Sequence, residues 1–190
     1  LKGFLRTFPK TIAEVDKMIT RHGIWVGRTI GLGIMSPDEA LNYGLSGPMV
    51  RASGVSWDIR RDFPYLDYET YDFDVAVGVN GDVYDRFLVR MEEMRQSVRI
   101  LEQAVQRLPD GPLNVDDPRL ILPPKHKATS EMESMIHHFK VVMEGPRPPV
   151  GEVYVPVEGP KGEKGYYFVS DGTSKPVRWR IRPPAFVNLS

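Results

Sequence analysis

The stretch from Val83 to Leu108, VYDRFLVRMEEMRQSVRILEQAVQRL, decides how this chain folds. Its apolar residues recur at alternating spacings of four and three, the period of one face of an α-helix. They are Phe87, Met91, Met94, Val98, Leu101, Val105 and Leu108. At 1.5 Å per residue, a helix over residues 83–107 is about 37 Å long. We therefore predict a long central helix that ends before Pro109.

Two further helices are predicted on the N-terminal side. Residues 8–22 share an apolar face and open with a capping box at Thr11 and Glu14, while Gly23 marks their end. Residues 36–44 open with Ser-Pro-Asp-Glu, in which serine caps the helix and proline takes the first helical position. The apolar, glycine-rich run 24–35 predicts a short strand. We expect a second strand at residues 71–77, where apolar and polar side chains alternate.

The C-terminal part predicts one helix followed by a small sheet. After an irregular, proline-rich stretch over 110–128, a capped helix begins at Ser130 and stops at Gly145. Its apolar residues are predicted to face the core: Met132, Met135, Ile136, Phe139 and Met143. Three β-rich segments, separated by Gly/Pro and Asp-Gly turns, predict an antiparallel meander: 153–157, 166–169 and 177–181. The fold class is therefore α+β, with a long central helix and a C-terminal antiparallel sheet.

Composition excludes several classes of protein. The chain carries 25 basic and 25 acidic residues, so its zero net charge argues against nucleic acid as a partner. It has no cysteine, which excludes disulfides, zinc–thiolate sites and cysteine-held iron–sulfur or nickel–iron centres within this sequence. No apolar run approaches the roughly 20 residues of a membrane span, and the start lacks the apolar segment of a signal peptide.

No complete catalytic or metal site is apparent from the residues alone. Glu133 and His137 lie one helical turn apart, but adjacent histidines diverge by about 100° on a helix, so His138 cannot join them. Gly31-Leu32-Gly33 lacks the third glycine of a dinucleotide fingerprint. Neither Ser53 nor Ser170 lies in a nucleophile elbow, and no P-loop is present. We predict no metal ion and no catalytic residue in this chain.

Two charged patterns allow more than one interpretation. The charges of the 83–107 helix form either a solvated face with i,i+4 pairs or a buried network coupled to proton or electron movement. In the final strand, Arg178, Arg180 and Arg182 alternate with apolar residues, which places three guanidinium groups on one sheet face. They face solvent, internal carboxylates or an acidic protein partner.

Several strings, in one order from end to end, resemble the D subunit (the 49-kDa-type subunit) of NADH:quinone oxidoreductase, respiratory complex I. The N-terminal strings are Arg28-Thr29, SPDEALNYG (36–44), RASG (51–54) and WDIR (57–60). The central ones are GDVYDR (81–86), EEMRQS (92–97) and MESMIHHFK (132–140). The C-terminal ones are EG (144–145), PKGE (160–163), VSDG (169–172) and FVNL (186–189).

This resemblance implies a fold similar to the large subunit of nickel–iron hydrogenases, without the metal centre and its cysteines. It implies a role in forming the quinone-reduction chamber and in coupling electron transfer to proton translocation. The implied partners are the terminal iron–sulfur cluster subunit, the C-type subunit and quinone, with FMN and the iron–sulfur clusters in partner subunits and no cofactor bound by this chain. The implied location is peripheral, on the cytoplasmic side of the inner membrane or the matrix side of a mitochondrion.

The sequence departs from the family pattern at both ends. The histidine–glycine motif and the later tyrosine that contact quinone in the family do not occur, nor does the closing aspartate–arginine segment. The chain is therefore expected to be a single partial domain over 1–190, the C-terminal half of a subunit of this type. No catalytic role transfers to a residue here, and the cofactor-binding residues are unknown. The remaining candidates for coupling or interface roles are Arg51, Asp58, Arg60, Asp85, Arg86, Arg90, Glu93, His137 and Lys161.

Two alternatives remain open. One is the D-type subunit of a related membrane complex that takes electrons from ferredoxin or another donor. The other is a non-catalytic interaction protein derived from the same family. If the chain is a fragment, we expect it to be inactive alone and to self-associate through uncovered apolar surface.

Overall fold

The computed structural model describes residues 1–189, which form two compact units. The first unit holds residues 1–108, 156–165 and those from 182 onward, and the second holds 109–155 and 166–181. The elements are helical up to residue 143 and are followed by a three-stranded sheet and a last short helix. The predicted α+β class is therefore confirmed.

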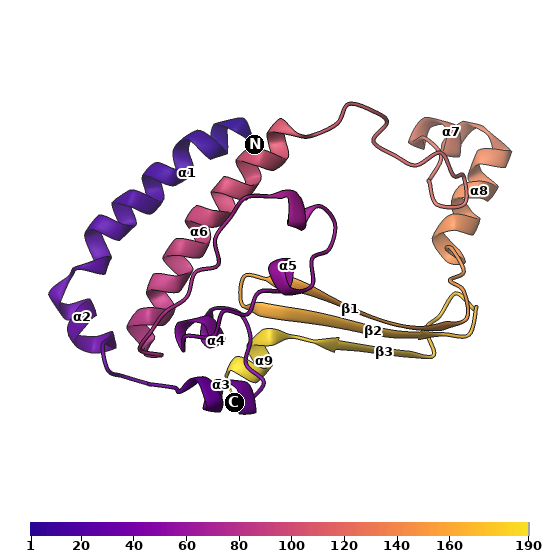
Figure 1. Ribbon diagram of the computed structural model, residues 1–190. Coiled ribbons are helices and arrows are strands. Elements are labelled where there is room, and N and C mark those ends of the chain that lie inside the picture. Colours follow the sequence, from indigo (N-terminus) through magenta and orange to yellow (C-terminus); the bar gives the residue numbers. More distant parts are fainter. Residues whose placement is uncertain (190) are drawn as a thin grey trace. The chain divides into compact units, whose positions relative to one another are not determined.

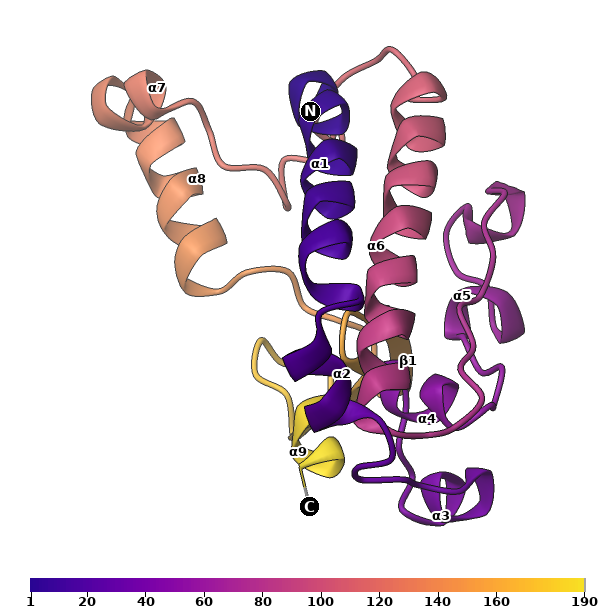
Figure 2. The ribbon, with the colours of Figure 1, turned by 90° about the vertical axis from the view of Figure 1, so that its left-hand side faces the viewer.

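Two long helices form the main helical layer of the first unit. Helix α6 (Val83–Gln106) matches the predicted long helix closely, and α1 (Lys2–Val15) lies antiparallel beside it in both ribbon views (Figures 1 and 2). Their facing side chains form one core cluster, in which Ile12 packs against Met91 and Val98. A π-helical turn (Asp16–Thr20) and α2 (Gly23–Thr29) continue the chain after α1.

The first unit also holds a second core cluster and several short helical elements. These are α3 (Pro37–Asn42), α4 (Pro48–Ala52), α5 (Ile59–Asp62), a 3-10 turn (Tyr68–Thr70) and α9 (Pro184–Asn188). The cluster consists of Ala40, Leu45 and Val50. The capping box predicted at the start of α3 is confirmed, because Ser36 accepts from the Glu39 amide and the Glu39 carboxylate accepts from the Ser36 amide.

The three strands form one sheet in the order β1-β2-β3, as the meander predicted. They are β1 (Gly151–Gly159), β2 (Gly162–Ser170) and β3 (Arg178–Arg182), and the turn between β1 and β2 holds two residues (Figure 1). The second unit adds α7 (Lys125–Ser130) and α8 (Met132–Met143), which pack against each other.

Both strands predicted in the N-terminal half are wrong. Residues 24–29 belong to α2, where the Trp25 ring meets Phe87 edge-on at 5.2 Å, and the chain then turns through Gly31 and Gly33 at positive φ. Residues 71–77 run without strand pairing because side chains of α6 take their place. The Gln103 and Gln96 amide oxygens accept hydrogen bonds from the backbone of Asp72 and Asp74 at 2.9 and 3.0 Å.

Five local predictions are also corrected. The first helix starts at Lys2, so Thr11 lies inside it and bonds the carbonyl of Thr7 instead of forming a cap. Gly23 begins α2 rather than ending a helix. The irregular stretch contains the start of α7, and α8 has no side-chain cap. The apolar face predicted to lie in the core is exposed at all five positions: Met132, Met135, Ile136, Phe139 and Met143.

Candidate functional site

The first unit encloses a buried arginine, Arg51, at the end of the short helix α4. Only 2% of its surface is exposed. The helix reaches this position because Gly47, at φ 67°, starts it and packs directly on the β1–β2 turn. A Cβ atom on Gly47 would lie 2.4 Å from the Cα of Gly162, so the approach requires glycine. The turn thereby brings β1 next to Arg51.

Arg51 joins three elements through its guanidinium group. Its Nη2 lies 2.6 Å from Oε1 of Glu93 on α6 and 3.0 Å from Oε1 of Glu158 on β1. Its Nε donates to the same Glu93 oxygen at 2.9 Å, and its Nη1 donates to the Trp57 carbonyl at 2.9 Å. The two carboxylates, distant in sequence, therefore share one donor nitrogen.

A second ion pair completes the group. Arg60 donates from Nε and Nη2 to the two oxygens of Asp58 at 2.9 and 2.6 Å, a bidentate pair. Asp58 is 1% exposed, lies 3.5 Å from Arg51 Nη1 and caps α5 by accepting from the Arg60 amide. We call these five residues the Arg51 cluster: Arg51, Asp58, Arg60, Glu93 and Glu158.

Burial sets the proton affinity of the carboxylates in this cluster. It raises the pKa of Glu93 and of Glu158, and the nearby Arg51 charge offsets only part of that effect. Burial acts in the same direction on Asp58, but the hydrogen bond and charge of Arg60, with the charge of Arg51, outweigh it and lower the pKa of Asp58. With three carboxylates and two guanidinium groups, the fully ionised cluster carries one net negative charge. One proton on either Glu93 or Glu158 would neutralise it.

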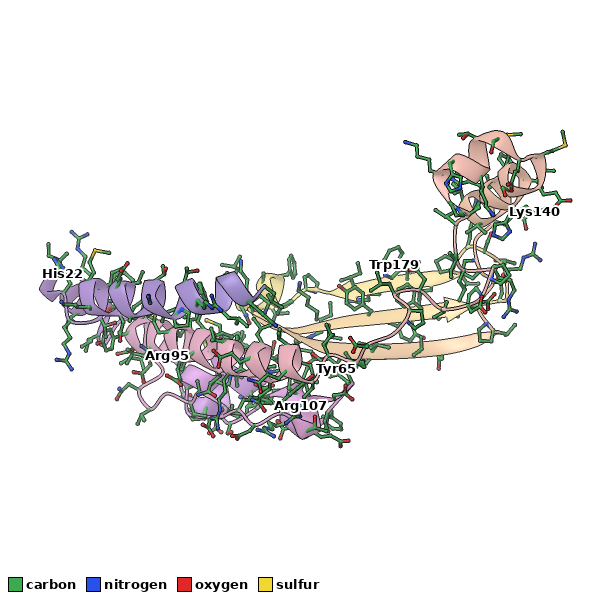
Figure 3. All side chains as sticks on the ribbon, turned by 90° about the horizontal axis from the view of Figure 1, so that it is seen from above. His22, Tyr65, Arg95, Arg107, Lys140 and Trp179 are labelled. Carbon is green, nitrogen blue, oxygen red and sulfur yellow. The ribbon has the colours of Figure 1, made fainter. Side chains whose placement is uncertain are left out.

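The cluster borders a cleft of about 430 Å³ in the first unit. The cleft is lined by Arg51, Arg60, Tyr68, Arg90, Glu93, Met94, Ser97, Glu158, Gly159 and Pro160. Nearby, the Tyr65 hydroxyl (labelled in Figure 3) accepts from the Glu158 amide at 3.1 Å. Burial raises the pKa of Tyr65. The arrangement is suited to binding a proton, because two acids with raised pKa line a cleft.

Four predicted residues meet in this cluster, namely Arg51, Asp58, Arg60 and Glu93, and Arg90 lines the cleft beside them. Sequence reasoning missed Glu158, which is 107 positions from Arg51. The only signal for it was a single acid in a β-rich segment. On the long helix, Glu93 takes part in a largely buried ion pair, whereas Arg95 and Arg99 form ion pairs near the surface. The coupling of buried charges to proton or electron movement stays a prediction.

Asp85 and Arg86, at the start of α6, lie outside the Arg51 cluster and bond the backbone of neighbouring loops. Asp85 accepts from the amides of Val79 and Asn80 at 2.9 and 2.5 Å. Arg86 donates to the carbonyls of Gly81 and Gly33 at 2.8 and 2.6 Å. These bonds fix the loops that precede the helix, which gives both residues a positioning role.

The two remaining candidates lie apart from the cluster. In the second unit, a ring nitrogen of His137 lies 3.1 Å from the Ile121 carbonyl oxygen. The side chain of Lys161 is exposed at the hairpin turn, and its carbonyl accepts from Asn188 at 2.9 Å. Among residues 1–189, no three or more histidine, aspartate or glutamate side chains gather in a way that could hold a metal ion. None of the helices in the same range combines the length and apolar character that a membrane crossing requires.

Comparisons with known proteins agree over the whole chain. The family described as "Respiratory-chain NADH dehydrogenase, 49 Kd subunit" matches residues 1–190. The D subunit of the NADH-quinone oxidoreductase of Geotalea uraniireducens is 52% identical over 189 residues, which cover 100% of this chain and 48% of that protein. The D subunit of Ehrlichia chaffeensis is 52% identical over 187 residues, covering 98% and 47%. That of Anaplasma marginale is 49% identical over 189 residues, covering 100% and 48%. The chain spans about half the length of these curated relatives.

Proposed function

The chain belongs to the family of the 49-kDa subunit of respiratory-chain NADH dehydrogenase, and we propose that it is part of the D subunit of an NADH-quinone oxidoreductase. In the whole subunit it helps to form the chamber where quinone is reduced and couples that reduction to proton translocation. The observation that carries the proposal is the match over all 190 residues, together with relatives at about half identity that are named as D subunits of NADH-quinone oxidoreductase.

The proposed setting follows from the same family membership. The fold is that of a hydrogenase-like large subunit of which this chain is one partial domain, and the long helix α6 and the absence of cysteine are consistent with it. Other subunits hold FMN and the iron–sulfur clusters. The neighbours are the terminal cluster subunit and the C-type subunit, and the assembly places the chain peripherally on the cytoplasmic or matrix side of the membrane.

Within that role, the Arg51 cluster is the proposed coupling element. It ties α4, α5, α6 and β1 together through buried charges, so a change of charge nearby alters the proton affinity of Glu93 and Glu158. Binding or release of a proton at Glu93 or Glu158 changes how strongly that acid interacts with Arg51. Because Arg51, on α4, interacts with Asp58 at the start of α5, with Glu93 on α6 and with Glu158 on β1, the change reaches all four elements. Arg90, at the cleft, is placed to respond to the charge of the cluster.

Assembly tests the first part of the proposal. The full-length subunit carrying an affinity tag is purified from membranes, and the co-purifying proteins, flavin, iron–sulfur signals and NADH:quinone activity are measured. We expect flavin and clusters in fixed ratio to the tagged subunit, with quinone-dependent NADH oxidation. A tagged subunit that purifies alone would contradict membership in this complex.

Two matched variants test the coupling role. Glu93→Gln removes the proton-binding carboxylate from the cluster, whereas Glu92→Gln alters the neighbouring acid, which forms an ion pair with Arg95 near the surface. In the assembled enzyme we expect Glu93→Gln to lower quinone-linked proton translocation and to change the pH profile of quinone reduction. NADH oxidation by a water-soluble acceptor should stay unchanged. If both variants translocate protons like the parent enzyme, the Arg51 cluster is only structural.

A further inference from the structure

Strand β3 forms one edge of the sheet. In the order β1-β2-β3 it pairs on one side with β2, and no strand within residues 1–189 pairs with its other side. Its first four residues are exposed, in the sequence Arg-Trp-Arg-Ile. An exposed edge of this kind presents unpaired backbone donors and acceptors, which can pair with an extended chain.

The three arginines along this edge differ in their partners. Arg178 and Arg180 point to the same face because side chains alternate along a strand. Arg182 lies 3.5 Å from the Glu163 carboxylate and donates to the Gly44 carbonyl at 2.8 Å. By contrast, neither Arg178 nor Arg180 forms an ion pair with a carboxylate of the described residues. Two guanidinium groups at every second position are therefore available to an acidic partner.

The opposite face of the same edge is apolar. The Trp179 ring, 58% exposed, stacks on Phe168 with the ring centroids 5.2 Å apart. Figure 3 labels Trp179 on β3. Beside it, an apolar groove of about 680 Å³ in the second unit is lined by side chains that include Val150, Val153 and Pro176. The groove can take apolar side chains from a segment that lies along β3.

We propose that β3 is a docking edge for an extended protein segment in which acidic and apolar residues alternate. The segment adds a fourth strand to the sheet, with its backbone bonded to β3. Its acidic side chains face Arg178 and Arg180, and its apolar ones enter the groove beside Trp179. A second copy of β3 does not fit this edge, because it would set arginines against arginines. The inference is independent of the quinone role.

Fluorescence anisotropy with short labelled peptides tests the proposal on the 190-residue chain. The probe is Glu-Val-Glu-Leu-Glu-Val-Glu, and its partners are the same peptide with lysine at each glutamate and the acidic peptide with a central proline. Because opposite charges stabilise a cross-strand pair and like charges destabilise it, we expect the lysine peptide to bind roughly tenfold more weakly. The proline peptide should also lose binding, because proline removes a backbone donor and disrupts pairing.

Charge reversal on the protein gives the complementary test. The double variant Arg178→Glu/Arg180→Glu should prefer the lysine peptide. The control Arg6→Glu/Arg21→Glu carries the same change of net charge at exposed positions elsewhere and should keep the preference for the acidic peptide. The proposal is overturned if the acidic and lysine peptides bind equally to the parent chain, if the proline peptide binds as tightly as the acidic one, or if both double variants change preference alike.

Discussion

The two units of this chain differ in what they bury. Every buried hydrophobic side chain within residues 1–189 lies in the first unit, and so do the buried polar and charged side chains, including Arg51 and Asp58. In the second unit the apolar side chains of α8 are exposed, with Met135 at 54% and Phe139 at 62%.

The first unit therefore supplies its own hydrophobic core, whereas the second unit does not bury one. The first unit has two core clusters and also buries the charged side chains of Arg51 and Asp58 almost completely. The second unit has regular secondary structure without any buried side chain in the described residues. An exposed apolar face such as that of α8 is typical of a surface that another protein segment covers. Self-association through this surface stays a prediction.

The largest effect we expect comes from Arg51→Ala in the first unit. This change leaves the carboxylates of Asp58, Glu93 and Glu158 buried without their shared guanidinium group. Removing one partner of a buried ion pair costs about 3–5 kcal/mol of the free energy of unfolding. Urea denaturation of the 190-residue chain measures this loss.

Arg95→Ala is the matched control for Arg51→Ala. Arg95 pairs with Asp16 and Glu92 at 2.8 and 3.0 Å but is 41% exposed. Exposed ion pairs contribute about 0–1 kcal/mol, so this variant should lose little stability. Equal losses in the two variants would mean that water reaches Arg51 as freely as Arg95, which would contradict the burial of Arg51 in the first unit.

A pair of methionine variants tests the difference in burial between the two units. Met91 is buried between α6 and α1, whereas Met143 at the end of α8 is 66% exposed. Replacing a buried methionine by alanine costs about 2–5 kcal/mol, and an exposed substitution stays within about 0.5 kcal/mol. We expect Met91→Ala to lower the urea midpoint strongly and Met143→Ala to leave it almost unchanged. A strong effect of Met143→Ala would show that α8 is covered in solution, for example by self-association.

Sequence reasoning succeeded where structure depends on near neighbours. The seam from Phe87 to Leu108 fixes α6 because residues three and four apart share a helix face, and Ser36 with Glu39 fixes the start of α3. It failed at 24–35, since a glycine-rich apolar run has no distinct period. Glu158 could not be predicted because its partners lie far away in sequence. The α8 face was predicted to be buried because periodicity identifies an apolar face without specifying what covers it.

The smallest expected effect is a difference in the pH dependence of stability between variants of a buried and an exposed acid. Burial raises the pKa of Glu93 above the ordinary glutamate value of 4.5, so the native state binds its proton more tightly than the unfolded state does. The stability from this proton is complete below pH 4.5 and is lost as pH rises through the raised pKa. Glu93→Gln removes this dependence. Relative to the parent chain, the variant should therefore gain stability as pH rises from 4.5 towards neutrality, in urea denaturation at several pH values.

Glu39→Gln should show the opposite sign. Hydrogen bonds from Ser36 lower the pKa of Glu39, an exposed residue, so its contribution is present above pH 4.5 and is lost as pH falls through the lowered pKa. Relative to the parent chain, Glu39→Gln is therefore least stable at neutral pH and approaches the parent in acid. Two variants of one unit should thus diverge in opposite directions as pH rises. If Glu93→Gln instead follows Glu39→Gln, the charge and hydrogen bonds of Arg51 outweigh burial at Glu93, and the pKa of Glu93 is not raised in the native state.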